Sequence, residues 1–236
     1  MGSRSPAFGG FCEGLYGKML NQYGTADMEQ LGMLVKALGV DETSHVLDAG
    51  CGTGVTTAYL AAATGARFTG VDKEAQAIES ARRRAGASAG RLAFTVGTMD
   101  ALEFPVGSFD AIVSIESLYF PKDLTETVRQ FKALLRPGGR MGLFFTHLGE
   151  KGASPGETRL GQSLTANALT FEAYDLSEAD RRFWARAKEV GEQVRADAAA
   201  EEGDNSDLLH LGETQAVLDF MTKGGHARYL YVARAA

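Results

Sequence analysis

Three glycines alternate directly after an apolar run, and an acidic residue stands just before them. The run Val46–Ala49 contains Asp48 and is followed by Gly50, Gly52 and Gly54. Glycine is needed where a backbone turns sharply and where a ligand must approach the main chain closely. A glycine loop between a strand and a helix is typical of nucleotide sites, so the sequence predicts a nucleotide-like ligand at residues 48–54.

The spacing and Asp48 favour one nucleotide over another. A dinucleotide loop reads G-x-G-x-x-G and receives a pyrophosphate at a helix N-terminus, whereas this loop reads G-x-G-x-G with Val55 at the last position. A carboxylate a few ångströms from a pyrophosphate would be repelled by roughly 1–4 kcal/mol, which argues against an NAD-dependent oxidoreductase. S-adenosylmethionine carries a sulfonium and an ammonium but no phosphate, and Asp72, at the end of the next apolar run, would accept hydrogen bonds from its ribose.

The elements around the loop alternate in a way that is typical of βαβ units and a parallel sheet. Helical patterns cover 55–64, which ends at Gly65, 74–85, and 122–135, which stops before Pro137–Gly139. The flanks are more helical, with helices expected at 11–23, 28–38, 177–201 and 213–222, and with a loop at 147–162. Strands are expected at 44–49, 67–72, 92–97, 109–115, 140–146, 168–174 and 227–233.

Composition limits the classes of function. The chain has 236 residues, 44% of them hydrophobic, and 24 basic against 30 acidic residues give a net charge of −6. This balance disfavours nucleic-acid binding and favours a small-molecule partner. The two cysteines have neither disulfide-framework nor metal-ligand spacing, so no metal is expected. No apolar run approaches the roughly 20 residues of a membrane span, so we expect a cytoplasmic protein, monomeric or homodimeric, without membrane contact.

The glycine loop resembles motif I of the class I S-adenosylmethionine-dependent methyltransferases. The resemblance continues through 71–81, 97–114 and 134–145 and is strong over residues 44–146. It is nearest to small-molecule enzymes of the ubiquinone/menaquinone-biosynthesis and natural-product type. It implies an α/β fold with a doubly wound, mostly parallel seven-stranded sheet in the order 3-2-1-4-5-7-6, whose seventh strand is antiparallel.

The resemblance also implies a division of the chain and a set of cofactor contacts. One methyltransferase domain would span 1–236, with an N-terminal helical cover (1–40), a cofactor-binding core (41–146), a substrate-side loop, strand and helical insertion (147–226), and a last strand (227–236). The loop would hold the methionine part of the cofactor, and Asp72 its ribose. Thr98-Met99 departs from the Asp-Ala common in relatives, so the Met99 backbone and Asp100 would meet the adenine instead. The expected cofactor contacts are Asp48, Gly50, Cys51, Gly52, Gly54, Asp72, Lys73, Met99, Asp100, Ile115 and Tyr16.

The expected chemistry is methyl transfer to an O, N or C atom of a small apolar or aromatic metabolite, with S-adenosylhomocysteine as product. Alignment supplies much of the catalysis of such an in-line displacement, and a base matters when the acceptor must lose a proton. The candidates are His147 as base, Tyr119 as base or substrate-orienting group, and Glu116, all expected just after strands whose carboxyl ends form the crevice. The alternative is a cofactor-binding scaffold with a non-methylating activity such as cyclisation.

Overall fold

Seven strands form one sheet in the computed structural model, which describes residues 26–86, 90–149, 153–198, 220 and 226–235. The order is β3-β2-β1-β4-β5-β7-β6. Neighbours among β1 to β5 are parallel, and β7 is antiparallel to both β5 and β6. This confirms the predicted fold and strand order. The strands are β1 (His45–Ala49), β2 (Arg67–Asp72), β3 (Leu92–Val96), β4 (Phe109–Ile115), β5 (Leu135–Leu148), β6 (Leu169–Asp175) and β7 (His226–Ala235).

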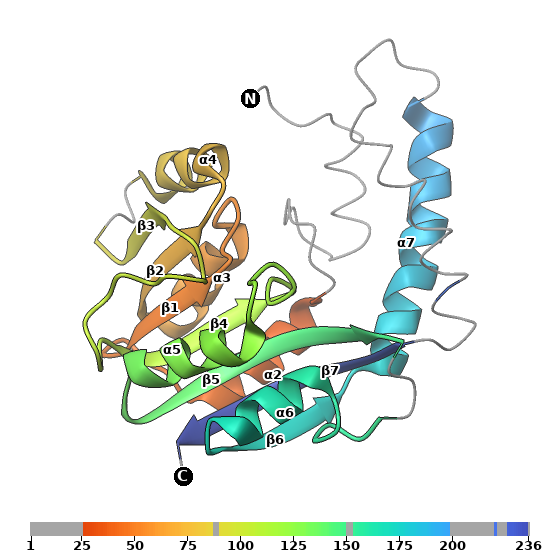
Figure 1. Ribbon diagram of the computed structural model, residues 1–236. Helices are drawn as coiled ribbons and strands as arrows, with labels where there is room; N and C mark the ends of the chain where they lie inside the picture. The colour runs from red at the N-terminus through yellow and green to blue at the C-terminus, as the bar shows by residue number, and fades with distance from the viewer. Residues whose placement is uncertain (1–25, 87–89, 150–152, 199–219, 221–225, 236) are drawn as a thin grey trace.

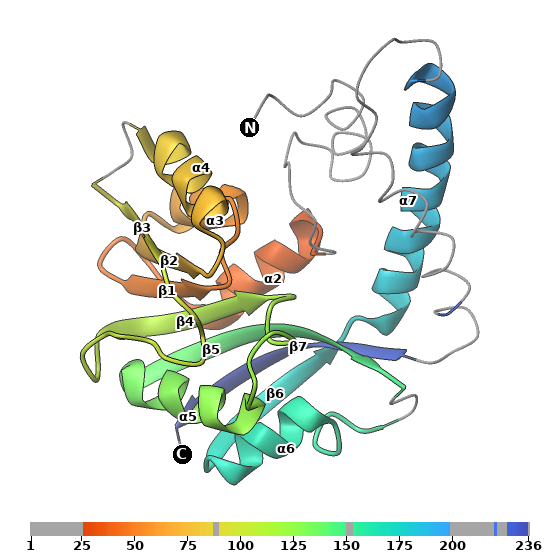
Figure 2. The same ribbon diagram turned by 45° about the horizontal axis from the view of Figure 1, so that its top comes forward.

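Helices cover both faces of the sheet. The helices α2 (Met28–Leu38), α3 (Val55–Thr64) and α4 (Ala75–Ala85) pack with one set of buried side chains, and α5 (Leu124–Leu134) and α6 (Arg159–Ala166) pack with a second set on the opposite face. Figure 1 shows α5 and α6 together in front of the sheet. The long helix α7 (Ser177–Ala198) follows β6 in the chain and rises away from the sheet in both views (Figures 1 and 2).

Local signals explain where several helices begin and end. The side chain of Asp27 accepts a hydrogen bond from the Gln30 backbone N–H at the start of α2, and Asp123 does the same for Glu126 at the start of α5. Such caps satisfy N–H groups that have no partner inside the helix. Gly65 ends α3 in the left-handed conformation, as the sequence predicted. The glycine loop therefore leads into a helix of defined length.

The largest differences from the sequence-based expectation lie around β5 and α6. The predicted loop 147–162 contains the start of α6, which is capped by Thr158 and buries Leu160 and Leu164, one turn apart. Pro137–Gly139 falls within the bounds of β5 but forms an irregularity there: the pairing with β4 shifts register between Leu135 and Arg140, and Gly138 has φ 79°. β5 also continues through Leu148. The expected helix 11–23 lies outside the described residues, as does the expected helix 213–222 apart from Phe220.

Candidate functional site

The carboxyl ends of β1, β2, β4 and β5 lie at one edge of the sheet because these strands are parallel. In open α/β sheets, ligands bind in the crevice beyond this edge. The glycine loop follows β1, Asp72 closes β2, and Glu116 follows β4. The structure thus brings the predicted loop, the predicted ribose-binding acid and one predicted catalytic residue to the same edge.

The glycine loop is held tightly against its neighbours and is open on one side. The backbone N–H groups of Gly50 and Cys51 both donate to the Val71 carbonyl, at 2.8 and 3.0 Å. Gly50 has φ 84°, and a Cβ there would overlap the Cβ and Oγ of Ser117. Gly52 has φ 52°, and a Cβ there would meet nothing within 4 Å. The loop therefore needs glycine at Gly50 for packing, while Gly52 borders open space that a ligand could enter.

Asp48 lies beneath the loop rather than in its open side. Its side chain is buried, and its Oδ2 accepts a hydrogen bond of 2.6 Å from the hydroxyl of Thr57 in the first turn of α3. Burial raises the pKa of Asp48 to about 6, opposed by the Thr57 hydrogen bond and reinforced by the charge of Asp72. Asp48 can thus place a negative charge under a bound ligand near neutral pH, but its carboxylate is not exposed on the open side of the glycine loop.

Asp72 braces the loop from the end of β2. One carboxylate oxygen accepts from the Gly52 N–H at 2.8 Å, and the other accepts from the Glu74 N–H at 2.9 Å. Each carboxylate oxygen has a second lone pair, so both can still accept a hydrogen bond from a hydroxyl. The position suits the ribose role predicted for Asp72, and it also makes this residue part of the loop's own support.

A pair of buried serines links the end of β4 to the loop. Ser117 Oγ donates to the Ala49 carbonyl at 2.7 Å and shares a hydrogen bond of 2.6 Å with Ser114 Oγ. Both side chains are buried. The only sequence signal is two hydroxyl residues three positions apart at the end of an apolar strand. These contacts explain why Gly50 and the segment after β4 lie so close together.

Glu116 occupies the centre of a polar cluster and has a left-handed backbone with φ 52°. Its carboxylate accepts hydrogen bonds from Arg228 Nε at 2.7 Å, from the Tyr119 hydroxyl and from Thr146 Oγ1 at 3.3 Å. Burial, followed by the carboxylate of Glu116, raises the pKa of Tyr119 above its usual range. The geometry therefore makes Tyr119 a hydrogen-bond donor to Glu116, and it does not support either residue as a free base.

The structure corrects the predicted position of His147. Because β5 continues to Leu148, His147 is a strand residue paired with Ala227 and does not follow the strand. Its side chain is 2% exposed and lies on the opposite face from the Glu116 cluster, stacked near Phe145 and hydrogen-bonded to the Tyr231 hydroxyl at 3.1 Å. This place in the core gives no geometric support to the predicted role as base.

We expect the imidazole of His147 to remain neutral down to acid pH. Burial, and then the charge of Arg159, lower its pKa from 6.5 to about 4. A lowered folded-state pKa contributes stability that is present above about pH 6.5 and is lost as the pH falls through about 4. Titration of the His147 imidazole by NMR checks the value. His147→Gln, which can still bond Tyr231, should flatten the stability loss between these pH values, and an unchanged loss would contradict the assignment.

The remaining predicted cofactor contacts surround the edge with different exposure. Lys73 Nζ lies 4.8 Å from the ring centre of Phe120, which is 63% exposed, so the ends of β2 and β4 approach each other over the edge. The carboxylate of Asp100 accepts from the Lys122 N–H at 2.8 Å, which fixes the turn after β3. Burial raises the pKa of the Cys51 thiol. Two further candidates, Met99 and Ile115, are partly buried in the two apolar cores, and Tyr16 lies outside the described residues.

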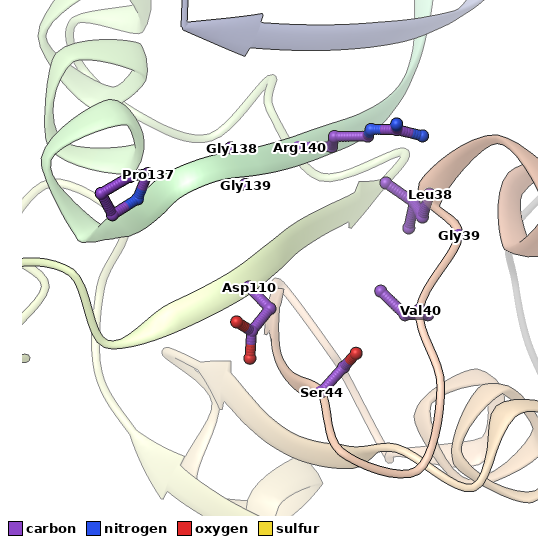
Figure 3. A pocket seen from close by; sticks show the side chains of 9 residues that line it. All are labelled: Leu38, Gly39, Val40, Ser44, Asp110, Pro137, Gly138, Gly139 and Arg140. Carbon is purple, nitrogen blue, oxygen red and sulfur yellow. The ribbon is translucent and has the colours of Figure 1, made fainter.

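A cavity of about 250 Å³ lies at the other end of the sheet. Figure 3 shows its lining, which comes from the end of α2, the segment before β1 and the starts of β4 and β5. Its charged groups are already paired: Asp110 accepts from the His45 N–H and from Arg136, and Arg140 donates to the Ala37 carbonyl. The candidate site is therefore the carboxyl edge and not this cavity.

The described ranges contain neither a metal-ligand cluster nor a membrane-spanning helix. Residues 26–86, 90–149, 153–198, 220 and 226–235 hold no group of three or more His, Cys, Asp or Glu side chains placed to bind a metal ion. None of the helices in this part of the chain is long and apolar enough to cross a membrane.

Comparisons with known proteins agree with the fold and the loop. Residues 46–139 match the methyltransferase domain family. The chain is 41% identical over 101 residues to the O-methyltransferase cnsE of Penicillium expansum, which covers 41% of this chain and 36% of that protein. It is 40% identical over 100 residues to a ubiquinone biosynthesis O-methyltransferase of Methylocella silvestris, covering 42% of this chain and 39% of that protein. The matches thus span less than two-fifths of these relatives.

Solved structures share the fold over more of the chain. A geranyl diphosphate methyltransferase in complex with S-adenosylmethionine has a TM-score of 0.69 at 21% identity, covering 88% of this chain and 85% of that one. The [4+2]-cyclase SpnF has a TM-score of 0.71 at 22% identity, covering 88% and 80%. Identities this low establish the fold alone. Residues 46–139 thus match the methyltransferase domain family, and the chain as a whole shares the fold of these structures.

Proposed function

We propose that the chain binds S-adenosylmethionine at the carboxyl edge and transfers its methyl group to a small-molecule acceptor. The observation that carries this proposal is the loop at Gly52, which is open on one side, has the Asp72 carboxylate at 2.8 Å from its N–H, and lies above the buried Asp48. Negative groups beside and beneath a glycine cradle suit a cationic nucleoside and disfavour a pyrophosphate. The methyltransferase domain match over residues 46–139 and the solved structure in complex with S-adenosylmethionine support the same cofactor.

In this proposal each part of the edge has a separate task. The cofactor, when bound, supplies a methyl group on a positively charged sulfur. The loop Asp48–Gly54 would hold its methionine part, and Asp72 would accept hydrogen bonds from the ribose hydroxyls. Lys73, Met99 and Asp100 would surround the adenine, and Ile115 would lie below it. Because these residues align the methyl group with the acceptor, most of the rate enhancement comes from positioning.

We propose that the acceptor is a small apolar or aromatic metabolite that binds above β4 and β5. Tyr119 and Phe120 are 41% and 63% exposed at this edge and offer an aromatic surface to such a molecule. Tyr119 would orient the acceptor through the hydroxyl that it shares with Glu116. The curated relatives named as O-methyltransferases support an oxygen acceptor.

The test is a product assay that separates methyl transfer from other activities of this fold. Because one chain of the same fold is named as a cyclase, turnover of an acceptor alone is not sufficient. We expect one S-adenosylhomocysteine for each product molecule, and a product heavier than the acceptor by one methylene unit. Conversion of an acceptor without any S-adenosylhomocysteine would exclude methyl transfer and support the cyclase alternative.

Asp72→Ala should weaken S-adenosylhomocysteine binding at least about tenfold, because hydrogen bonds to a charged group are worth about 1.5–3 kcal/mol each. The change removes the ribose acceptor and also the contact to the Gly52 N–H. Isothermal titration calorimetry measures the affinity. The matched control is Glu79→Ala, which removes an exposed carboxylate that pairs with Arg83 on α4 and should bind like the wild type. Equal affinities for both variants would contradict the role of Asp72.

A further inference from the structure

Four residues of α7 and β7 carry buried polar atoms without a hydrogen-bond partner in the described part of the chain. They are both carboxylate oxygens of Asp180, Nε1 of Trp184, both ring nitrogens of His226 and Nη2 of Arg228. Folded proteins leave few buried polar groups unpaired, because each costs about 1–3 kcal/mol. Each of these atoms lacks a partner among the side chains around it, and a bound ligand would supply one.

Arg228 fixes the geometry of this cluster. Its side chain is fully buried in β7, with Nε bonded to Glu116 at 2.7 Å and Nη1 bonded to Gln30 Oε1 at 2.7 Å. Asp180 Oδ1 lies 3.6 Å from Arg228 Nε, and Asp180 Oδ2 lies 3.5 Å from His226 Nε2. Both separations are longer than ordinary hydrogen bonds. The guanidinium is therefore held by two partners while Nη2 and the Asp180 carboxylate remain available.

The cluster lies between α7 and the end of the sheet that carries the glycine loop. Asp180 and Trp184 are four residues apart on α7, so their side chains share one helix face. His226 and Arg228 are two residues apart on β7 and point to the same face of the sheet. Glu116 connects this group to Ser117, whose hydroxyl bonds the Ala49 carbonyl next to the loop. A molecule bound at the cluster would thus lie on the acceptor side of the edge.

The charges and the unpaired atoms limit the chemistry of the ligand. The carboxylates of Glu116 and Asp180 both lie near the guanidinium of Arg228, an arrangement that disfavours a further anion. Asp180 needs a hydrogen-bond donor, whereas Arg228 Nη2 and Trp184 Nε1 need an acceptor. An ether or ketone cannot supply the donor, and an ammonium cannot supply the acceptor. A neutral hydroxyl group supplies both.

We propose that Asp180, Trp184, His226 and Arg228 form a subsite that binds a hydroxyl group of a neutral alcohol or phenol acceptor. The hydroxyl donates to the Asp180 carboxylate and accepts from Arg228 Nη2 and Trp184 Nε1, which uses its one hydrogen and both lone pairs. His226 Nε2 lies 3.5 Å from Asp180 Oδ2 on the other side of that carboxylate group. The assignment rests on the proposed function, since it names the substrate class of that site. It adds contacts from α7 and β7 to Tyr119, the substrate-orienting residue of the proposed function.

The single tryptophan of the chain makes the subsite directly observable. A ¹H–¹⁵N spectrum contains one indole N–H signal, which belongs to Trp184. Phenol, added with and without S-adenosylhomocysteine, should shift this signal saturably as the N–H gains an oxygen partner. Anisole, which lacks the donor, and benzoate, which is an anion, should leave it in place. An unmoved signal with phenol, or equal shifts with anisole, would overturn the proposal.

Matched variants on α7 test the role of the carboxylate. Asp180→Asn keeps the shape of the side chain and should weaken phenol binding at least about tenfold, because a charge-assisted hydrogen bond is lost. Glu178→Gln removes the same charge from the exposed face of that helix, where it pairs with Arg181, and should leave binding unchanged. Equal phenol affinities in the two variants would contradict the subsite.

Two further measurements keep the result unambiguous. Trp184→Phe keeps an aromatic side chain and removes the N–H together with the five-membered ring. We expect phenol binding, followed on the phenol signals by saturation transfer, to weaken about fivefold; undiminished binding would count against the subsite. Calorimetry with S-adenosylhomocysteine on the same samples reports the proposed function separately. If the protein binds the cofactor but phenol leaves the indole signal unmoved, only the subsite is contradicted. If the protein does not bind the cofactor, the proposed function is contradicted.

Discussion

Gly50→Ala should lower the free energy of unfolding by about 3 kcal/mol or more and abolish S-adenosylhomocysteine binding. The new methyl group would overlap Ser117 Cβ and Oγ, and the backbone would remain at φ 84°, where an L-residue is strained. Overpacking typically costs about 1–3 kcal/mol, and a strained backbone of this kind costs about as much again. Denaturant unfolding measures the first effect and calorimetry the second.

Two variants separate packing from ligand access. Gly52→Ala has open space around its Cβ, so it should cost only about 1 kcal/mol of stability, from the left-handed backbone, and still block the cofactor. Ser117→Gly added to Gly50→Ala removes the overlap and should recover part of the stability. Equal stability of Gly50→Ala and Gly52→Ala would contradict the close contact between the glycine loop and the segment after β4.

The cofactor half of the fold could be read from the sequence because its signals are local. Alternating apolar runs and helical patterns gave β2 and β4 with their bounds, and Gly65 gave the end of α3. The start of β5 was harder to predict, because the turn signal Pro137–Gly139 produces a register shift within the strand and does not end it. The helix α6 was missed, since its capping residue Thr158 stands in a segment rich in glycine and polar residues.

The acceptor side could not be read in the same way because its contacts join distant segments. The prediction of His147 as a base assumed that β5 ended before this residue. In the structure β5 continues, and His147 pairs with Ala227 of β7 and is buried in the core. Arg228 gave a usable signal, a charged residue within the apolar strand 227–233, which implies a buried partner. Its partners Glu116 and Gln30 lie 112 and 198 residues away, so the sequence could indicate the pairing but not name it.

Asp48→Asn should stabilise the free protein by about 3 kcal/mol at neutral pH and make cofactor binding weaker. The carboxyl of Asp48 has a pKa of about 6 in the folded chain, against an ordinary value of 3.8. A raised folded-state pKa contributes stability that is present below about pH 3.8 and is lost as the pH rises through about 6. The difference of about two in pKa corresponds to about 3 kcal/mol, and an asparagine, which can still accept from Thr57, does not incur this loss.

The pH dependence distinguishes this effect from a change in packing. The stability difference between Asp48→Asn and the wild type should be near zero at pH 4 and fully developed above pH 7, as measured by denaturant unfolding at each pH; a constant difference would contradict a buried carboxylate. S-adenosylmethionine carries positive charge, so binding should favour the ionised carboxylate and release a proton near pH 6. Calorimetry in buffers of different ionisation enthalpy should detect that release in the wild type and not in the variant, because only the wild type has a charge beneath the loop to titrate.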